Sequence, residues 1–137
     1  VIAGMYAVYH GPEGLVAIAE RVHALTNDLV GRLRAGGVDV VNDSWFDTIV
    51  VRVDDARTIH AEAVAAGLNF RRIADDTIGI SLDEATTVNE LQTLLSIFLV
   101  DQMISICEFE GIPYQMSPDL IDRAWANMFV KEETIVH

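Results

Sequence analysis

The sequence contains one cysteine and one lysine, and each shortage excludes a class of protein. A lone cysteine, Cys107, cannot form an internal disulfide, so a disulfide-stabilised secreted domain is excluded and a reducing compartment is expected. A nucleophilic cysteine needs an electropositive setting, whereas Glu108 and Glu110 follow Cys107 closely. We therefore expect Cys107 to act as an ordinary small apolar residue and not as a nucleophile. The lone lysine, Lys131, lies near the last residue, beyond the clear periodic pattern. If a longer parent enzyme uses a Schiff base, we expect its lysine to lie outside this chain.

Basic residues are scarce as a class. The chain has 9 basic and 21 acidic residues, and its formal net charge is −12. A field of this sign repels phosphate backbones, so nucleic acid is not expected to be a partner. Arg71 and Arg72 form the one adjacent basic pair that could bind an anion.

Long apolar runs and familiar catalytic motifs are absent as well. The longest strongly apolar run, residues 94–100, contains Ser96 and ends at Asp101, so it is far shorter than a membrane span and no membrane is expected. The first residues show no basic region followed by an apolar core and a cleavage site, so no secretory signal is expected. The sequence has no glycine-rich phosphate loop, no nucleophile elbow and no cluster of zinc ligands. We therefore expect no metal site and assign no catalytic residue.

Apolar residues are abundant enough for one domain. The chain has 137 residues, of which 51% are hydrophobic and 22% charged, and such a composition is globular. It begins with Val1, inside an apolar segment, and we expect it to be a piece of a longer protein.

The stretch around His10 is expected to join two helices. Residues 1–9 are typical of the last turns of a helix, and Gly11 and Pro12 indicate a turn followed by a new helix start. Apolar residues then recur at steps of three and four over residues 12–34, and two glycines end the helix. His10 has two interpretations. It is either a structural residue of the joint or part of an active site, since functional groups often lie at the ends of elements.

The remaining pattern predicts an α+β fold with helices packed on one face of a small sheet. Runs of β-branched and aromatic residues indicate four strands, and helical periodicity indicates a helix after each strand pair. The spacing of Thr87 and Glu90 is that of a capping box, which begins the last of these helices. The strands are expected at residues 38–41, 45–53, 68–73 and 77–82, and the helices at residues 56–66 and from residue 87 onward.

We divide the chain into three parts. Residues 1–11 are the end of an inter-domain helix and its joint, and residues 12–100 are the small α+β domain. Residues 101–137 are a connector or a packed arm, in which residues 119–129 can form a short amphipathic helix after a Ser-Pro cap signal.

Several polar side chains could bind a substrate, although each also has a structural interpretation. Arg71 and Arg72 could hold a substrate carboxylate through paired hydrogen bonds, or one of them could pair with a turn acid. Adjacent acids are more typical of turns and helix caps than of acid–base chemistry. These acids are Asp54–Asp55, Asp75–Asp76 and Asp83–Glu84, and further candidates that are more often structural are Ser81, Trp45 and Phe46.

Five stretches, in the same order, resemble the P-protein family of the glycine cleavage system, glycine dehydrogenase (decarboxylating). The first is Tyr9-His10-Gly11-Pro12-Glu13-Gly14-Leu15, which is similar to a Tyr-His-Gly-Pro-x-Gly-Leu signature. The others are residues 18–23, 42–48, 65–72 and 79–87, and the resemblance covers residues 1 to about 100. Residues beyond Asp101 show no secure similarity to the family.

The resemblance implies the small, C-terminal domain of the first half of a fold type I enzyme that uses pyridoxal 5'-phosphate (PLP). The family decarboxylates glycine on PLP and passes the aminomethyl group to the lipoyl arm of H-protein. The implied partners are lipoylated H-protein and the other half or a second subunit of P-protein, in a bacterial cytoplasm. Because the family's PLP lysine lies in the second half, we expect no covalently bound PLP and no activity of this chain alone. His10 is the residue that could approach the cofactor.

Two other interpretations stay open. The chain could be the small domain of another fold type I enzyme, such as a class V aminotransferase or a cysteine desulfurase. In related enzymes an arginine two residues before a strand serine often holds the substrate carboxylate, whereas Gly79 stands in that relation to Ser81 here. The chain could also be a stand-alone α+β dimerisation or ligand-binding module.

Overall fold

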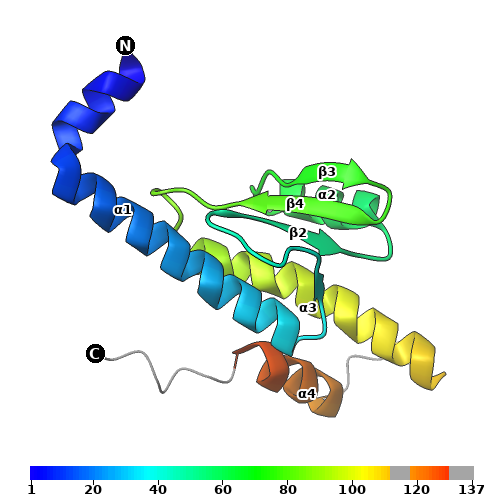
Figure 1. The fold of residues 1–137 in the computed structure, drawn as a ribbon. Coiled ribbons are helices and arrows are strands. Elements are labelled where there is room, and N and C mark those ends of the chain that lie inside the picture. The colour runs from blue at the N-terminus through cyan, green and yellow to red at the C-terminus, as the bar shows by residue number, and fades with distance from the viewer. Residues whose placement is uncertain (112–117, 130–137) are drawn as a thin grey trace.

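The computed structural model describes residues 1–111 and 118–129, which form a mixed domain of helices and antiparallel strands (Figure 1). The order of elements is the one expected, so the α+β prediction is confirmed. Ser117 and Lys131 lie outside the described residues. The elements are α1 (Ile2–Ala35), β1 (Asp39–Val40), β2 (Thr48–Arg52), α2 (Ala56–Ala65), β3 (Arg71–Ala74), β4 (Thr77–Ser81), α3 (Val88–Glu110) and α4 (Pro118–Phe129).

The four strands form one antiparallel sheet in the order β1-β2-β4-β3. β2 pairs with β1 on one side, as the expected hairpin-like pair, and with β4 on the other. The register places Ile49 opposite Ile80 and Val51 opposite Ile78. Because strand side chains alternate between the two faces, these four residues share one face, and all four are buried.

The helices cover that face of the sheet, as predicted (Figure 1). α1 and α3 lie side by side, and α2 packs against β3, β4 and α3. α1 supplies Leu29 and Leu33 to the core, both fully buried, and α3 supplies Leu95 and Phe98. Burial of each such side chain contributes about 2 kcal/mol of transfer free energy. This one-sided apolar layer therefore holds sheet and helices together.

Two strands begin three residues later than the sequence pattern indicated. β2 begins at Thr48 and not at Trp45, because the Trp45 indole N–H donates to the Asn27 side chain on α1 at 2.7 Å and keeps this residue in a loop. β3 begins at Arg71 and not at Leu68, because the Leu68 N–H donates to a carbonyl near the end of α2. Tertiary and capping contacts, which strand propensity does not report, set both starts.

α3 begins at the predicted capping box. The Thr87 hydroxyl accepts from the Glu90 N–H at 3.2 Å, and the Glu90 carboxylate accepts from the Thr87 N–H at 2.7 Å. The helix runs past Asp101, where the sequence pattern weakens, and ends at Gly111 in the left-handed conformation. By length and composition Val88–Phe109 could cross a membrane, but 50% of its most apolar window is buried inside the domain. A helix that is apolar and half buried in this way is typical of a protein core.

Replacing Thr87 with alanine tests the capping box. Thr87→Ala removes the hydroxyl that accepts from the first turn of α3, and the loss of an N-cap of this kind lowers the free energy of unfolding by about 1 kcal/mol. Asn89→Ala, an exposed change in the same turn, is the control and should shift it by less than about 0.5 kcal/mol. Urea unfolding followed by circular dichroism measures both, and equal effects would contradict the cap.

Candidate functional site

The bend in α1 departs most clearly from regular structure. The helix is interrupted at Gly11, which has a φ of +66° and a ψ of 176° (Figure 1). Glycine adopts a positive φ at little cost, whereas a side chain makes it unfavourable. Pro12 follows directly, and its fixed φ and missing N–H suit the first position of the second helical segment. The predicted joint between two helices is therefore present.

Gly14 makes room for His10 across the bend. A Cβ at Gly14 would lie 3.1 Å from the Cβ of His10, which is closer than an ordinary contact. The His10 ring contacts two tyrosine rings, with centroid distances of 4.4 Å to Tyr6 and 5.0 Å to Tyr9. The spacing His-Gly-Pro-x-Gly therefore has a geometric cause, because the two glycines and the proline each meet a requirement of the bend.

A loop at the head of α3 holds the second segment of α1, after the bend. Arg21, in the second segment of α1, donates to the Glu84 carbonyl at 2.9 Å and to the Thr86 carbonyl at 2.8 Å. Across the bend, desolvation, followed by the charge of the Glu84 carboxylate and a hydrogen bond to it, raises the pKa of Tyr6 above its ordinary value. We refer to Tyr6, Arg21 and loop residues 83–86 together as the clasp.

The loop of the clasp has its own internal hydrogen bonds. The Asp83 carboxylate accepts from the Ala85 N–H and from the Thr86 hydroxyl, both at 3.0 Å. The Thr86 hydroxyl also accepts from the Asp83 N–H at 3.0 Å. The acidic pair Asp83–Glu84 thus forms a turn and contributes to the clasp, in line with the structural interpretation of its sequence.

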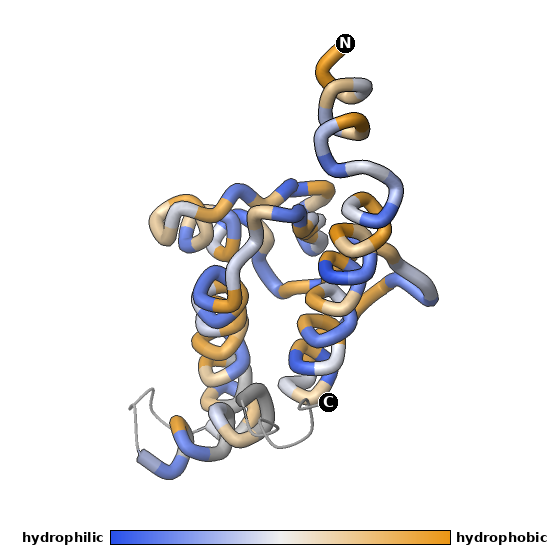
Figure 2. Tube along the Cα trace, turned by 90° about the vertical axis from the view of Figure 1, so that its left-hand side faces the viewer, coloured by the Kyte–Doolittle hydropathy of each residue, from blue (hydrophilic) through white to orange (hydrophobic). Residues whose placement is uncertain are grey.

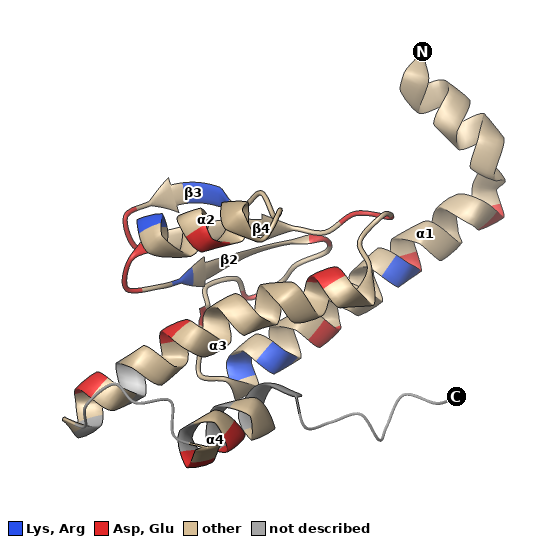
Figure 3. Cartoon of the chain, turned by 180° about the vertical axis from the view of Figure 1, so that it is seen from behind, with Lys and Arg blue, Asp and Glu red and all other residues tan. Residues whose placement is uncertain are grey.

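The helical segment before the bend carries an exposed apolar surface. Its exposed side chains are Ile2 (86% exposed), Met5 (68%), Val8 (85%) and Tyr9 (86%). The segment contains no charged residue and projects from the body of the domain (Figures 2 and 3). Large exposed apolar patches are typical of surfaces that contact another protein surface.

Sequence comparison assigns the chain to a protein family. A family model described as "Glycine cleavage system P-protein" matches residues 1–98. The chain belongs to this P-protein family. Two proteins named glycine dehydrogenase (decarboxylating) align with it over 98 residues, one from Shewanella sediminis at 47% identity and one from Xanthomonas axonopodis pv. citri at 52%. Each alignment covers 72% of this chain and 10% of the relative.

Two further comparisons concern the fold and the end of the chain. A solved structure titled "NifS-like protein" is similar, with a TM-score of 0.55 and 23% identity over 69% of this chain and 30% of that chain. This likeness shows a shared fold. A second family model, described as a domain of unknown function, matches residues 85–127. The P-protein match favours that family over the aminotransferase, the desulfurase and the stand-alone module.

The structure does not bring together the residues suggested for a P-protein substrate site. His10 lies at the bend, whereas Arg71 and Arg72 lie in the edge strand β3, away from the bend in two views (Figures 1 and 3). Adjacent strand residues point to opposite faces, so the two arginine side chains diverge. Arg71 pairs in register with Gly79, on the face that the helices leave open. Neither arginine side chain forms a hydrogen bond or an ion pair with any residue that the structure describes.

Other candidates have structural contacts. Asp55 accepts from the Arg57 N–H and caps α2, and Asp76 pairs with Arg52 at 2.9 Å in the turn between β3 and β4. Trp45 is partly buried against the core.

The clasp is the part of the joint that the sequence did not reveal. Arg21 lies 63 residues from Glu84 and 65 from Thr86, and no local motif at either place indicates a contact. Ser81, a predicted binding candidate, shares a cross-strand hydrogen bond with Thr48 at 2.9 Å. Both contacts depend on how the elements pack, which residue spacing does not report.

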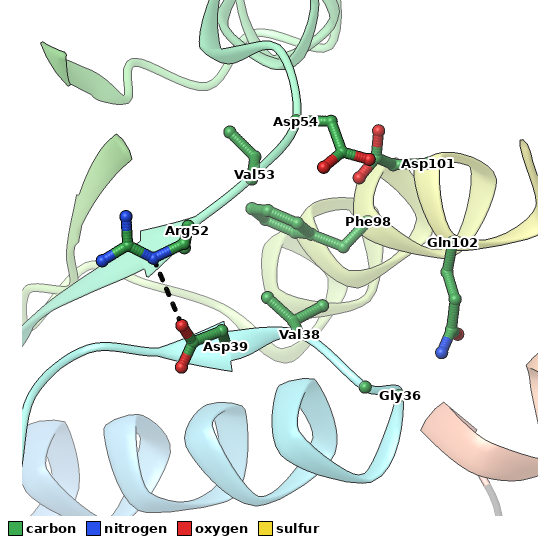
Figure 4. A pocket seen from close by; sticks show the side chains of 10 residues that line it. Gly36, Val38, Asp39, Arg52, Val53, Asp54, Phe98, Asp101 and Gln102 are labelled. Atoms are coloured by element: carbon green, nitrogen blue, oxygen red, sulfur yellow. Dashed lines mark hydrogen bonds and ion pairs between the residues drawn. The ribbon is translucent and has the colours of Figure 1, made fainter. Parts of the chain in front are cut away.

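A cavity of about 280 Å³ lies between the C-terminal end of α1, the β1–β2 edge and α3 (Figure 4). The side chains of Asp54 and Asp101 point toward one another at its rim (Figure 4). Desolvation, and then the charges of Asp54, Glu62 and Asp55, raises the pKa of Asp101. Because burial and the neighbouring acids favour the protonated form, the ionised form of Asp101 destabilises the fold.

These acids do not form a metal site. Within residues 1–111 and 118–129, no group of three His, Cys, Asp or Glu side chains could hold a metal ion.

Asp101→Asn tests this destabilisation. We expect the variant to have a higher free energy of unfolding than the wild type at pH 7 and nearly the same value near pH 3. A raised pKa means that the folded state binds the proton more tightly than the unfolded state. The stabilisation of the folded state by protonated Asp101 is therefore complete below the ordinary pKa of 3.8. It is lost as the pH rises through the pKa that Asp101 has in the folded state.

The control for this pH series is Asp43→Asn, which removes one negative charge from an exposed loop position. Urea unfolding at about pH 3, 5 and 7 measures all three proteins. A gain at pH 7 no larger for Asp101→Asn than for the control would show that burial and the neighbouring acids do not act on Asp101.

Proposed function

We propose that this chain is the small α+β domain of a PLP-dependent enzyme that decarboxylates glycine and passes the aminomethyl group to the lipoyl arm of H-protein. Membership of the P-protein family, the names of its relatives and the NifS-like fold support this proposal. Because the chain spans 10% of the length of those relatives, the activity belongs to a longer polypeptide and the chain alone is expected to be inactive. Its partners would be lipoylated H-protein and the other half or a second subunit of P-protein, in a bacterial cytoplasm.

The described residues do not fit covalent attachment of PLP. They include no lysine, and Lys131 lies outside them. A Schiff base to the cofactor needs a lysine amine, so the cofactor would be held by other parts of the enzyme. The domain would then act by positioning and by excluding water, not by bonding to the cofactor.

The joint is the observation that carries the proposal. The bend at Gly11 sets the direction in which the N-terminal segment leaves the domain, and Arg21 holds the second segment of α1 to the loop before α3. The exposed apolar side chains of that segment would pack against the preceding domain as part of an inter-domain helix. The bend would thereby set where residues 12–100 lie relative to the catalytic cleft, with residues 101–137 as a connector or packed arm.

Two sites on this domain could reach a substrate from the edge of such a cleft. His10 lies at the joint, where the rings of Tyr6 and Tyr9 contact its imidazole. Arg71, on the open face of the sheet beside Gly79, can donate paired hydrogen bonds to a carboxylate, and Arg72 offers the same chemistry on the opposite side. His10 would then be a cofactor-side residue, and one of the two arginines would be a substrate-side residue, since their side chains point to opposite faces.

A hybrid enzyme tests the proposal. Residues 1–98 of this chain replace the aligned 98 residues of the Shewanella sediminis glycine dehydrogenase, and release of CO2 from glycine is measured with lipoylated H-protein. We expect the hybrid to retain activity within about tenfold of the parent, because the joint and the core that position the cleft are preserved. A folded, PLP-loaded hybrid without activity would contradict the proposal.

Two substitutions in the hybrid distinguish the effect of losing the clasp from the effect of losing a surface charge. Arg21→Gln removes both hydrogen bonds to the loop carbonyls, and we expect kcat to fall at least about tenfold through loss of domain position. Arg57→Gln, at an exposed position with a loose 3.9 Å ion pair, is the control and should leave kcat unchanged. Equal activity of the two variants would show that the clasp does not position the domain.

A further inference from the structure

α4 lies outside the part of the chain that matches P-proteins. The P-protein match ends at residue 98, inside α3, whereas α3 continues to Glu110 and α4 follows at Pro118–Phe129. The second family model, over residues 85–127, spans both helices almost completely. The α3–α4 pair is therefore a unit that overlaps the P-protein domain through α3 and extends beyond it through α4.

α4 packs against α1 and α3 on the side of these helices that faces away from the sheet (Figures 1 and 3). Ile121 is partly buried against the core, and Trp125, about one turn later, lines a cavity of about 240 Å³. Residues four apart share one face of a helix, so these two side chains lie on the face of α4 toward α1 and α3, where Trp125 stays 50% exposed. Asp119 and Asp122 are exposed.

The surface beneath α4 is formed by residues within the P-protein match. The 240 Å³ cavity is lined by α1 and α3 side chains that precede residue 98, and we call this surface the α1–α3 groove. Leu91 and Leu95 are its apolar floor and are 3% and 1% exposed in the intact chain. Its other lining residues, apart from Trp125, are Asp28, Arg32, Val88 and Gln92.

The charged side of the groove is already neutralised. Arg32 donates to the Asp28 carboxylate at 2.9 Å, and both side chains are partly buried. The groove thus offers two leucines beside an internally paired arginine and aspartate. Such a surface needs no charge from its occupant and selects an apolar helix face.

We propose that the α1–α3 groove is a helix-docking surface of the P-protein small domain, and that α4 is an intramolecular cap seated in it. The fitting occupant is an amphipathic helix with an aliphatic and an aromatic residue four positions apart on its inner face. In a longer family member, such a helix from elsewhere in the polypeptide would take the place that α4 takes here. This inference rests on packing and does not depend on the decarboxylase proposal.

Displacement of α4 in the full chain tests the cap. Ile121→Asp places a carboxylate where the isoleucine packs against the core, so α4 should leave the groove. A fluorescein-labelled peptide with the sequence of residues 118–129 then reports whether the groove is open, by fluorescence anisotropy. We expect the peptide to bind Ile121→Asp at least about tenfold more tightly than the wild-type chain, whose groove α4 already covers.

Two controls accompany this experiment. Asp122→Asn changes an exposed residue beside Ile121 on α4, and this chain should exclude the peptide as the wild type does. A peptide that itself carries Ile121→Asp should not bind any of the chains.

Three results would overturn the inference. Equal binding of the peptide to wild type and Ile121→Asp would show that α4 does not close the groove. Absence of binding to an Ile121→Asp chain that keeps its circular dichroism spectrum would show that the groove does not take a helix. Unfolding of the Ile121→Asp chain would show that α4 is an integral part of the core and not a separable cap.

Discussion

Coverage of one face of a small sheet is the constraint on which the rest of the structure depends. The isoleucine and valine side chains of β2 and β4 form an apolar surface that is removed from solvent only when helices pack against it. α1 and α3 must therefore lie side by side along that face. This packing brings the second segment of α1 against the loop that enters α3, where Arg21 meets two backbone carbonyls. The clasp is thus a consequence of the arrangement that forms the core.

The joint gives physical meaning to the sequence signature that the chain shares with P-proteins. Gly11 supplies a positive φ, Pro12 a helix start and Gly14 the space for His10, so all three act through backbone geometry. These three residues set a direction of the chain, whereas a catalytic motif supplies a reacting group.

Local signals in the sequence were sufficient for most elements. The apolar period of α1, the Asp55 cap, the capping box at Thr87 and the turn acids each depend on residues within one or two turns of one another, and the structure has all of them. The late start of β2 was not predictable, because it depends on the hydrogen bond from Trp45 to α1. The clasp and the packing of α4 against α1 and α3 could not be predicted for the same reason, since each joins segments that lie far apart in the chain.

A distance across the bend tests most directly whether the joint has a fixed geometry. Spin labels at Ile2→Cys and Gly31→Cys, both exposed positions, in a Cys107→Ala background report this distance by pulsed electron paramagnetic resonance. An unbroken helix, at about 1.5 Å per residue, would separate the two backbone positions by about 44 Å. A bend held by Gly11 and the clasp predicts one narrow distance clearly shorter than that value. A distance near 44 Å, or a broad distribution, would contradict a fixed joint.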